Sequence, residues 1–188
     1  MDMNEINLDS IDIKAIENSI DKRNTRIMKE KEGYLHCLDI TDTLKFYVDD
    51  DFKEDARLIS RRIKKLKLQN MHAALFVKTV RSIAVKRSIP LDMGGHIADK
   101  PEKLNLSSIE GVARNHIGVN EYALKHRQYK GLDDLTPEIE AKLKAEIKQC
   151  NQIIQNVAGA RTEIMALKEK LLSEEKANNG DFSEAPKP

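Results

Sequence analysis

The side chains most able to do chemistry are ten lysines and arginines between residues 57 and 88. This segment contains no aspartate or glutamate, so its formal charge is +10. On a helix, residues 61, 62, 64 and 65 would project away from the apolar face formed by Ile59, Ile63 and Leu66. They would leave a solvated basic ridge, which is the electrostatic footprint of a protein that binds a phosphate backbone. The ten cations are Arg57, Arg61, Arg62, Lys64, Lys65, Lys67, Lys78, Arg81, Lys86 and Arg87.

Two interpretations without a nucleic acid compete with this one. The ridge could be an ordinary solvated surface, or it could pair with residues 1–56, which carry 15 acidic and 8 basic side chains. An anionic membrane is a weaker candidate, because the apolar face lacks the Trp and Phe side chains that interfacial helices favour. The chain also lacks a run of roughly 18 apolar residues, so we expect no membrane-spanning helix.

A second candidate for binding DNA is a helix-turn-helix over residues 107–128, which would place its second helix in the major groove. In this interpretation Gly118 breaks the first helix and Asn120 begins the second. The match is imperfect, because Arg114 stands where such motifs usually carry a small residue. An ordinary helical hairpin is favoured over the motif. If the motif forms, the residues that it presents to the groove are Asn120, Tyr122 and Lys125.

Histidine and cysteine do not occur in the patterns typical of metal or catalytic sites. None of the five histidines has a ligand partner at suitable spacing, and no phosphate-binding loop, nucleophile elbow or zinc-protease motif is present. We therefore predict no metal, no cofactor and no enzymatic activity. The two cysteines, Cys37 and Cys150, lie far apart in the sequence, which favours a reducing, cytoplasmic setting.

The element around which these residues must be arranged is a long C-terminal helix, from Thr136 to about Lys176. Its apolar residues recur over about five heptads, which is typical of a helix that packs along its whole length. Thr136 can cap the first turn, and Pro137 suits the first helical position. The apolar stripe could face another copy of the chain or the earlier helices, and we favour an oligomer. The stripe residues are Leu143, Cys150, Val157, Ile164 and Leu171.

The remaining elements are predicted from helical periodicity, caps and breakers. Helices are expected at 10–31, 52–68 and 70–87, and another begins at Ser107 in a capping box completed by Glu110. Gly33 should end the first helix. Residues 34–48 carry apolar side chains of shared parity, which favours a small β-hairpin over a buried helix, although both interpretations stay open. The polar tail, residues 180–188, is expected to be disordered.

Composition agrees with a mainly α protein, since 34% of the residues are charged, 4% are aromatic and none is Trp. We predict a helical bundle in which residues 1–132 form an N-terminal helical domain and residues 133–179 form a coiled-coil-like oligomerisation helix. The predicted function is that of a cytoplasmic, oligomeric, non-enzymatic protein that binds nucleic acid, with DNA preferred, in a regulatory or assembly role. The alternative is a structural or adaptor coiled-coil protein that binds only other proteins.

Overall fold

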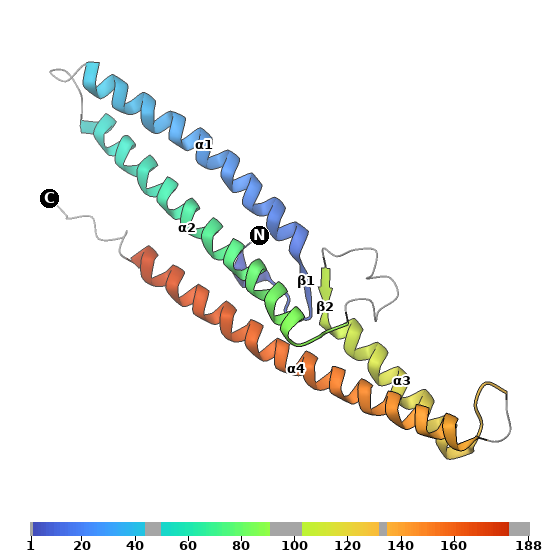
Figure 1. Ribbon diagram of the computed structural model, residues 1–188. Helices are drawn as coiled ribbons and strands as arrows, with labels where there is room; N and C mark the ends of the chain where they lie inside the picture. Colours follow the sequence, from blue (N-terminus) through green and yellow to red (C-terminus); the bar gives the residue numbers. More distant parts are fainter. Residues whose placement is uncertain (1, 44–49, 91–102, 132–134, 181–188) are drawn as a thin grey trace. The chain divides into compact units, whose positions relative to one another are not determined.

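Helices dominate the computed structural model, which describes residues 2–43, 50–90, 103–131 and 135–180 (Figure 1). The predicted mainly α helical bundle is therefore confirmed. In chain order the elements are a 3₁₀ turn at Met3–Glu5, β1 (Ser10–Asp12), α1 (Ile13–Thr43), α2 (Asp50–Lys86), β2 (Lys103–Asn105), α3 (Leu106–His126) and α4 (Pro137–Gly180).

The chain divides into two compact units. α2 and α4 contribute residues to both units. The predicted division between residues 132 and 133 does not coincide with these units. That residues 1–132 and 133–179 form separate domains stays a prediction. Of the described residues, unit 1 holds 2–5, 14–43, 50–78 and 167–180, and unit 2 holds 6–13, 79–90, 103–131 and 135–166.

The small antiparallel sheet of the structure lies in unit 2 and joins β1 to β2. Its central pair, Ile11 and Leu104, is buried at the core of that unit. The predicted hairpin at 34–48 is placed wrongly, because α1 continues through residue 43, while residues 44–49 lie outside the described residues. A short stretch of shared parity also fits a helix, and here it lies at the end of α1, where no described residue from 34 to 43 is fully buried.

In α1 and α2 the predicted breaks do not occur, and each is one continuous helix. Gly33 lies inside α1, where a Cβ would meet only Ile59 Cδ1 at 3.7 Å. Asn70 caps no second helix in α2. Its amide instead donates to Asn24 Oδ1 at 2.6 Å and to Ile20 O at 3.4 Å, which ties α2 to α1 within unit 1. The core of unit 1 includes Ile16, Leu66, Phe76, Val77 and Leu171.

In unit 2, Arg161 of α4 contacts both the segment before β1 and the first turns of α3. Its Nε donates to Asp9 Oδ1 at 3.0 Å, its Nη2 donates to Ser107 Oγ at 3.1 Å, and its Nη1 pairs with Glu110 of α3. The predicted capping box at Ser107 is wrong, because Ser108 N donates to Asn105 Oδ1 at 2.9 Å and Asn105 is the cap. Glu110 is therefore a partner of arginines rather than a capping residue.

The apolar stripe of α4 is covered within the chain itself. All five stripe residues are at most 5% exposed, and Val157 and Ile164 are fully buried. The predicted cap also holds, since Ile139 N donates to Thr136 Oγ1 at 3.3 Å. Of the two predicted alternatives, packing on the earlier elements of the same chain is the one observed, while self-association stays a prediction. Beyond Gly180 the predicted tail lies outside the described residues.

Replacing a stripe residue by a charge should strongly destabilise the protein. We expect Val157→Asp to lower the free energy of unfolding by more than about 3 kcal/mol, because the carboxylate would be buried without a partner. The matched variant Ala158→Asp places the same charge on the exposed side of α4 and should cost less than about 1 kcal/mol. Urea denaturation of both variants measures the difference, and equal losses would show that the stripe is not buried.

The Glu110 contacts predict a specific acid dependence. Hydrogen bonds from Arg161 and then Arg114 hold the pKa of Glu110 below its ordinary value. A carboxylate with a lowered folded pKa stabilises the fold above its unfolded pKa of about 4.3, and this stabilisation is lost as the pH falls through the folded pKa. The free energy of unfolding should therefore fall more steeply between about pH 5 and pH 3 in the wild type than in Glu110→Gln. Parallel pH profiles would contradict the assignment.

Candidate nucleic-acid interface

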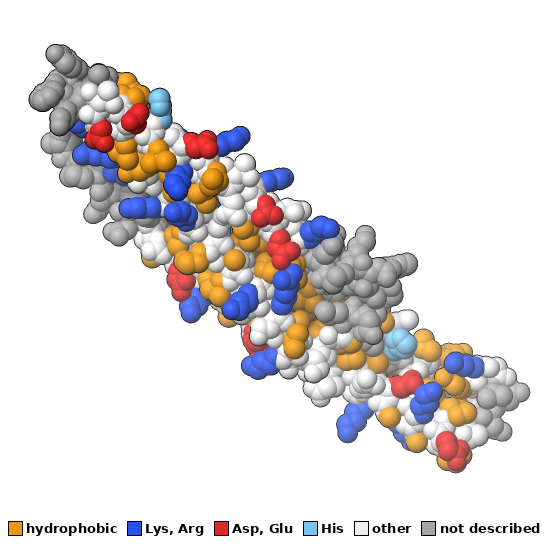
Figure 2. All heavy atoms as spheres, turned by 45° about the horizontal axis from the view of Figure 1, so that its top comes forward, with side chains coloured by type: hydrophobic (Ala, Val, Ile, Leu, Met, Phe, Trp, Pro, Cys, Tyr) orange, Lys and Arg blue, Asp and Glu red, His pale blue; other side chains and the backbone are white. Residues whose placement is uncertain are grey.

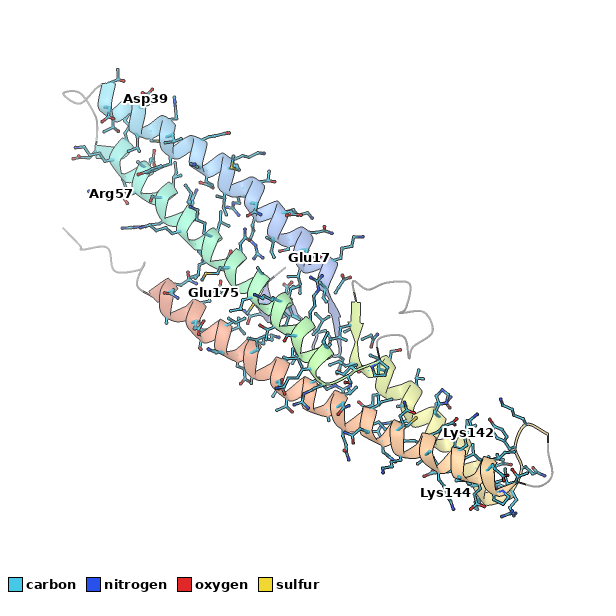
Figure 3. The ribbon with its side chains drawn as sticks, in the orientation of Figure 1. Glu17, Asp39, Arg57, Lys142, Lys144 and Glu175 are labelled. Atoms are coloured by element: carbon cyan, nitrogen blue, oxygen red, sulfur yellow. The ribbon has the colours of Figure 1, made fainter. Side chains whose placement is uncertain are left out.

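The predicted basic ridge occupies the first half of α2, in unit 1. Arg62, Lys64, Lys65 and Lys67 are exposed, and Arg61 is half-buried. None of these five cations forms an ion pair with another residue that the structure describes. Arg57, which lies near the beginning of α2 (Figure 3), contacts Glu54 at 3.8 Å, but both side chains are more than half exposed. Exposed pairs of this kind are worth only about 0–1 kcal/mol and exchange readily with other partners.

A groove lies between α1 and α2 on one side of this ridge, with a volume of ≈ 390 Å³. We name it the Tyr34 groove. Its α2 wall presents cations at positions 53, 57, 61 and 64, a spacing that keeps them on one helical face. Lys53 contacts Asp50 at 3.3 Å, but that aspartate is exposed as well. The groove is lined by Tyr34, Leu38, Thr41, Lys53, Ala56, Arg57, Ser60, Arg61 and Lys64.

The second pair of ridge cations, Arg62 and Lys65, lies about 100° further round the helix, because each is one residue beyond a cation of the first groove. These two side chains border another hollow of ≈ 350 Å³ together with Arg26, Leu66 and Gln69. Arg26 contacts Glu30 at 3.9 Å along α1. The basic surface of α2 therefore faces two directions rather than forming one flat patch. On the face that Figure 2 presents, lysine and arginine side chains are interspersed with hydrophobic and acidic ones.

Lys78 is exposed and is the last α2 residue of unit 1, whereas Arg81, Lys86 and Arg87 belong to unit 2 and differ in their surroundings. Arg81 and Lys86 are exposed. Arg87 is half-buried and its Nε donates to Glu163 Oε1 at 2.9 Å. The guanidinium of Arg87 also covers Gly159, since a Cβ at that position would lie 2.6 Å from Arg87 Cζ. Arg87 therefore joins the end of α2 to α4 and is already occupied by a structural contact.

The predicted helix-turn-helix is wrong, because α3 runs without a break from Leu106 to His126. Gly118 has no need of a positive φ, and a Cβ there would meet nothing within 4 Å. Asn120 begins no helix. It is 4% exposed and donates its amide to Glu146 Oε2 of α4 at 2.9 Å, so it is unavailable to a DNA groove.

The turn that does end α3 lies nine residues after Gly118. Arg127 adopts a left-handed conformation with φ 50° and donates its backbone N–H to Ala123 O. The two other residues of the predicted recognition helix remain on the surface. Tyr122 is 62% exposed, with its ring centroid 4.2 Å from that of His126, and Lys125 is exposed. They belong to unit 2, whereas the cations that line the Tyr34 groove belong to unit 1.

Sequence reasoning missed the α1 side of the basic surface. Arg26, Tyr34, Leu38 and Thr41 line the two hollows, but the expected break at Gly33 removed the last three from the helix. Their signal was present in the spacing, because Tyr34, Leu38 and Thr41 follow one another at i, i+4 and i+7.

No protein-family model, no curated protein and no solved structure matches this chain. Among the described residues, no group of three or more His, Cys, Asp and Glu side chains is arranged to hold a metal ion. The described helices include none that is long and apolar enough to cross a membrane.

Two glycine substitutions test whether α3 is continuous at Gly118 and whether the Arg87 side chain covers Gly159. Gly118→Ala should raise the free energy of unfolding by about 1 kcal/mol, because alanine favours a helix interior and the site has room. Gly159→Ala should change it by less than about 0.5 kcal/mol, since the same gain is offset when the Arg87–Glu163 pair is displaced.

The control is the Arg87→Ala background, in which Gly159→Ala should recover the full gain. Thermal or urea unfolding measures the wild type, Gly118→Ala, Gly159→Ala, Arg87→Ala and the double variant. A lower free energy of unfolding in Gly118→Ala would indicate a turn at that position and contradict the continuous helix.

Proposed function

We propose that this chain is a non-enzymatic, cytoplasmic nucleic-acid-binding protein that contacts phosphates through the first half of α2, in a regulatory or assembly role. The observation that carries the proposal is the set of cations at 61, 62, 64, 65 and 67, which form no ion pair with another residue in the described ranges. The competing explanation, that the ridge is neutralised by the acidic N-terminal segment, requires such pairs.

The Tyr34 groove supports a nucleic acid over a simple anion. It brings a half-buried tyrosine and two threonine or serine hydroxyls, Thr41 and Ser60, next to Arg61 and Lys64. Proteins that bind single strands combine such a cationic groove with an aromatic side chain on which a base stacks. Cations that face two directions also suit a flexible strand better than one flat contact. Duplex DNA, the partner favoured by the sequence, is therefore tested beside single-stranded DNA and RNA.

A second candidate function is an adaptor that binds only proteins, and one observation favours it. Met28 and Leu35 on α1 and Met71 and Leu75 on α2 are all at least 45% exposed, so four large apolar side chains of unit 1 remain in contact with solvent. Apolar side chains left in solvent on paired helices suit contact with another protein. Self-association, which we keep as part of the proposal, would use such residues rather than the stripe already covered on α4.

The decisive experiment compares two double charge reversals that change the net charge equally. Arg61→Glu with Lys64→Glu removes two cations of the Tyr34 groove, and Lys142→Glu with Lys148→Glu removes two exposed cations of α4 in unit 2. Fluorescence anisotropy with labelled single-stranded and duplex oligonucleotides measures binding. The first variant should bind at least about tenfold more weakly than the wild type, and the second should bind nearly as well. Circular dichroism verifies that both remain helical.

The salt dependence of the wild type provides the second criterion. Four phosphate contacts should give a log–log slope of about −3 to −4 on duplex DNA, or slightly less on a single strand. An equal loss of oligonucleotide affinity in both variants would show that binding depends only on the net charge of the protein. No binding to any of the oligonucleotides at low salt would remove the nucleic-acid function and leave the adaptor.

A further inference from the structure

In unit 1 the outer sides of α1 and α2 carry stripes of opposite charge. On α1 the members of the stripe recur at spacings of three, four and seven residues, which keeps them on one face of the helix. Four are acidic, two are large and apolar, and all six are exposed. Lys31 lies at the edge and offsets part of the charge. We name this face the acidic stripe, and it consists of Asp21, Met28, Glu32, Leu35, Asp39 and Asp42.

The corresponding face of α2 is basic and has the same spacing. It carries five cations and two large apolar side chains, and all seven are exposed. Lys53 and Arg57 contact acidic residues of their own helix at 3.3 Å and 3.8 Å, and such exposed pairs exchange readily with other partners. We name this face the basic stripe, and it consists of Lys53, Arg57, Lys64, Lys67, Met71, Leu75 and Lys78.

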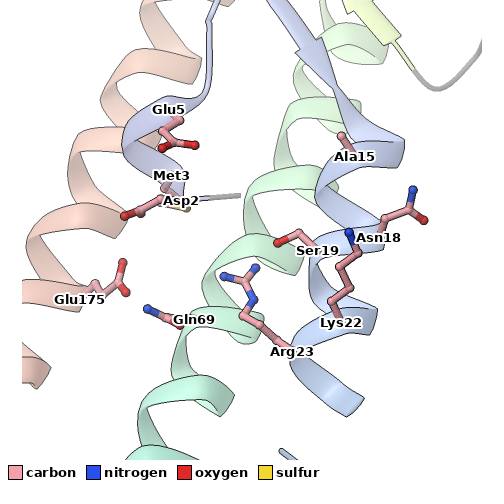
Figure 4. Close-up of a pocket in the computed structure, with 10 residues that line it drawn as sticks. All are labelled: Asp2, Met3, Glu5, Ala15, Asn18, Ser19, Lys22, Arg23, Gln69 and Glu175. Atoms are coloured by element: carbon pink, nitrogen blue, oxygen red, sulfur yellow. The ribbon is translucent and has the colours of Figure 1, made fainter. Parts of the chain in front are cut away.

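Both stripes point away from the elements that cover α1 and α2 within unit 1. Ser19 and Gln69 border a cavity that these two helices form with the start of the chain and the end of α4 (Figure 4). Ser19 lies nine residues before Met28, and Gln69 lies two residues before Met71, so each is roughly half a turn round its helix from the stripe. No carboxylate of the acidic stripe forms an ion pair with another described residue. The two stripes therefore stay open to a partner.

The antiparallel pairing of α1 and α2 fixes which charges lie at the same level. Asn70 donates its amide to Asn24 Oδ1 at 2.6 Å. Asp39 lies fifteen residues after Asn24, so it is level with a position about fifteen residues before Asn70, between Lys53 and Arg57. Figure 3 shows Asp39 and Arg57 at the same end of this helix pair. Opposite charges thus occur at matching levels of the two helices, but on outer sides that face different partners.

A second copy of the chain can bring the two stripes together. A two-fold axis parallel to the helices places α1 of each copy on α2 of the other without changing the level of either helix. A two-fold axis perpendicular to the helices would instead place α1 on α1 and α2 on α2, where like charges repel. We propose that the chain forms the first kind of dimer, in which the acidic stripe of each copy packs on the basic stripe of the other.

In this dimer Asp39 of each copy meets Lys53 and Arg57 of the partner subunit, and Glu32, seven residues earlier, meets the level of Lys64. The exposed apolar side chains of both stripes are covered in the same contact, which gives it an apolar centre and a charged rim. The inference rests on the self-association that is part of the proposed function, and it names the surface. Because Arg57 and Lys64 also line the Tyr34 groove, a nucleic acid and the second copy compete for them.

Sedimentation velocity of the full chain without nucleic acid tests the dimer. At about 50 mM salt and tens of micromolar protein the wild type should be a dimer, and its dissociation constant should rise at least about tenfold at about 500 mM salt, because exposed charges are screened. A monomeric wild type would overturn both this inference and the self-association in the proposed function. A dimer whose stability does not depend on salt would overturn the pairing of the stripes.

Two charge-reversed variants identify the surface. Glu32→Lys with Asp39→Lys reverses the acidic stripe, and Arg57→Glu with Lys64→Glu reverses the basic stripe at the same levels. Each variant alone should be monomeric, because like charges then face each other in both contacts. An equimolar mixture should form a heterodimer, in which opposite charges face each other again. Circular dichroism verifies that both variants remain helical, and if either does not, the salt dependence of the wild type decides.

The matched control is Glu121→Lys with Glu169→Lys, which changes the net charge as Glu32→Lys with Asp39→Lys does. Both glutamates are exposed and lie outside the two stripes, so this variant should dimerise as the wild type does. A stable dimer of Glu32→Lys with Asp39→Lys would overturn the proposed contact and leave self-association and nucleic-acid binding in place, since no cation of α2 is altered. Two monomeric variants that do not combine when mixed would also overturn it.

Discussion

Burial of the apolar stripe of α4 is the constraint on which the rest of the structure depends. The stripe extends from Leu143 to Leu171 and contributes to the cores of both units. Because the chain covers it with its own elements, the remaining helices must turn their apolar faces inward and their charges outward. The cations of α2 are on the surface for this reason. Arg161 adds directional contacts that link β1's neighbouring segment, α3 and α4 within unit 2.

Whether a basic residue of this chain can bind a phosphate depends on whether an acidic side chain already pairs with it. Arg61 and Arg87 look equivalent in the sequence, since both belong to a segment without acidic residues. In the structure Arg87 is paired with Glu163 and packed over Gly159, whereas Arg61 borders an open groove without an ion-pair partner among the described residues. Only the second kind of cation can neutralise a phosphate without first losing an internal partner.

Features that depend on long periodic patterns could be predicted from the sequence, whereas features that depend on single residues were predicted wrongly. The heptads of α4, its Thr136 cap and the basic ridge are all recovered, because each signal is repeated or local. Gly33 and Gly118 were taken as breaks, but glycine only weakens a helix, and packing against a neighbour outweighs a cost of about 1 kcal/mol. Asn120 was taken as a cap, yet its partner is Glu146, 26 residues away. The Tyr34 groove could not be predicted, because it depends on how α1 and α2 lie side by side.

Lysine footprinting with and without an oligonucleotide tests the central claim most directly, because it reports on individual cations of the unmodified protein. Reductive methylation followed by mass spectrometry gives the reactivity of each lysine. The account predicts that Lys64, Lys65 and Lys67 lose reactivity when a single-stranded oligonucleotide is added, while Lys142 and Lys148 keep theirs. Protection that is uniform over all lysines, or absent from the three lysines of α2, would contradict it.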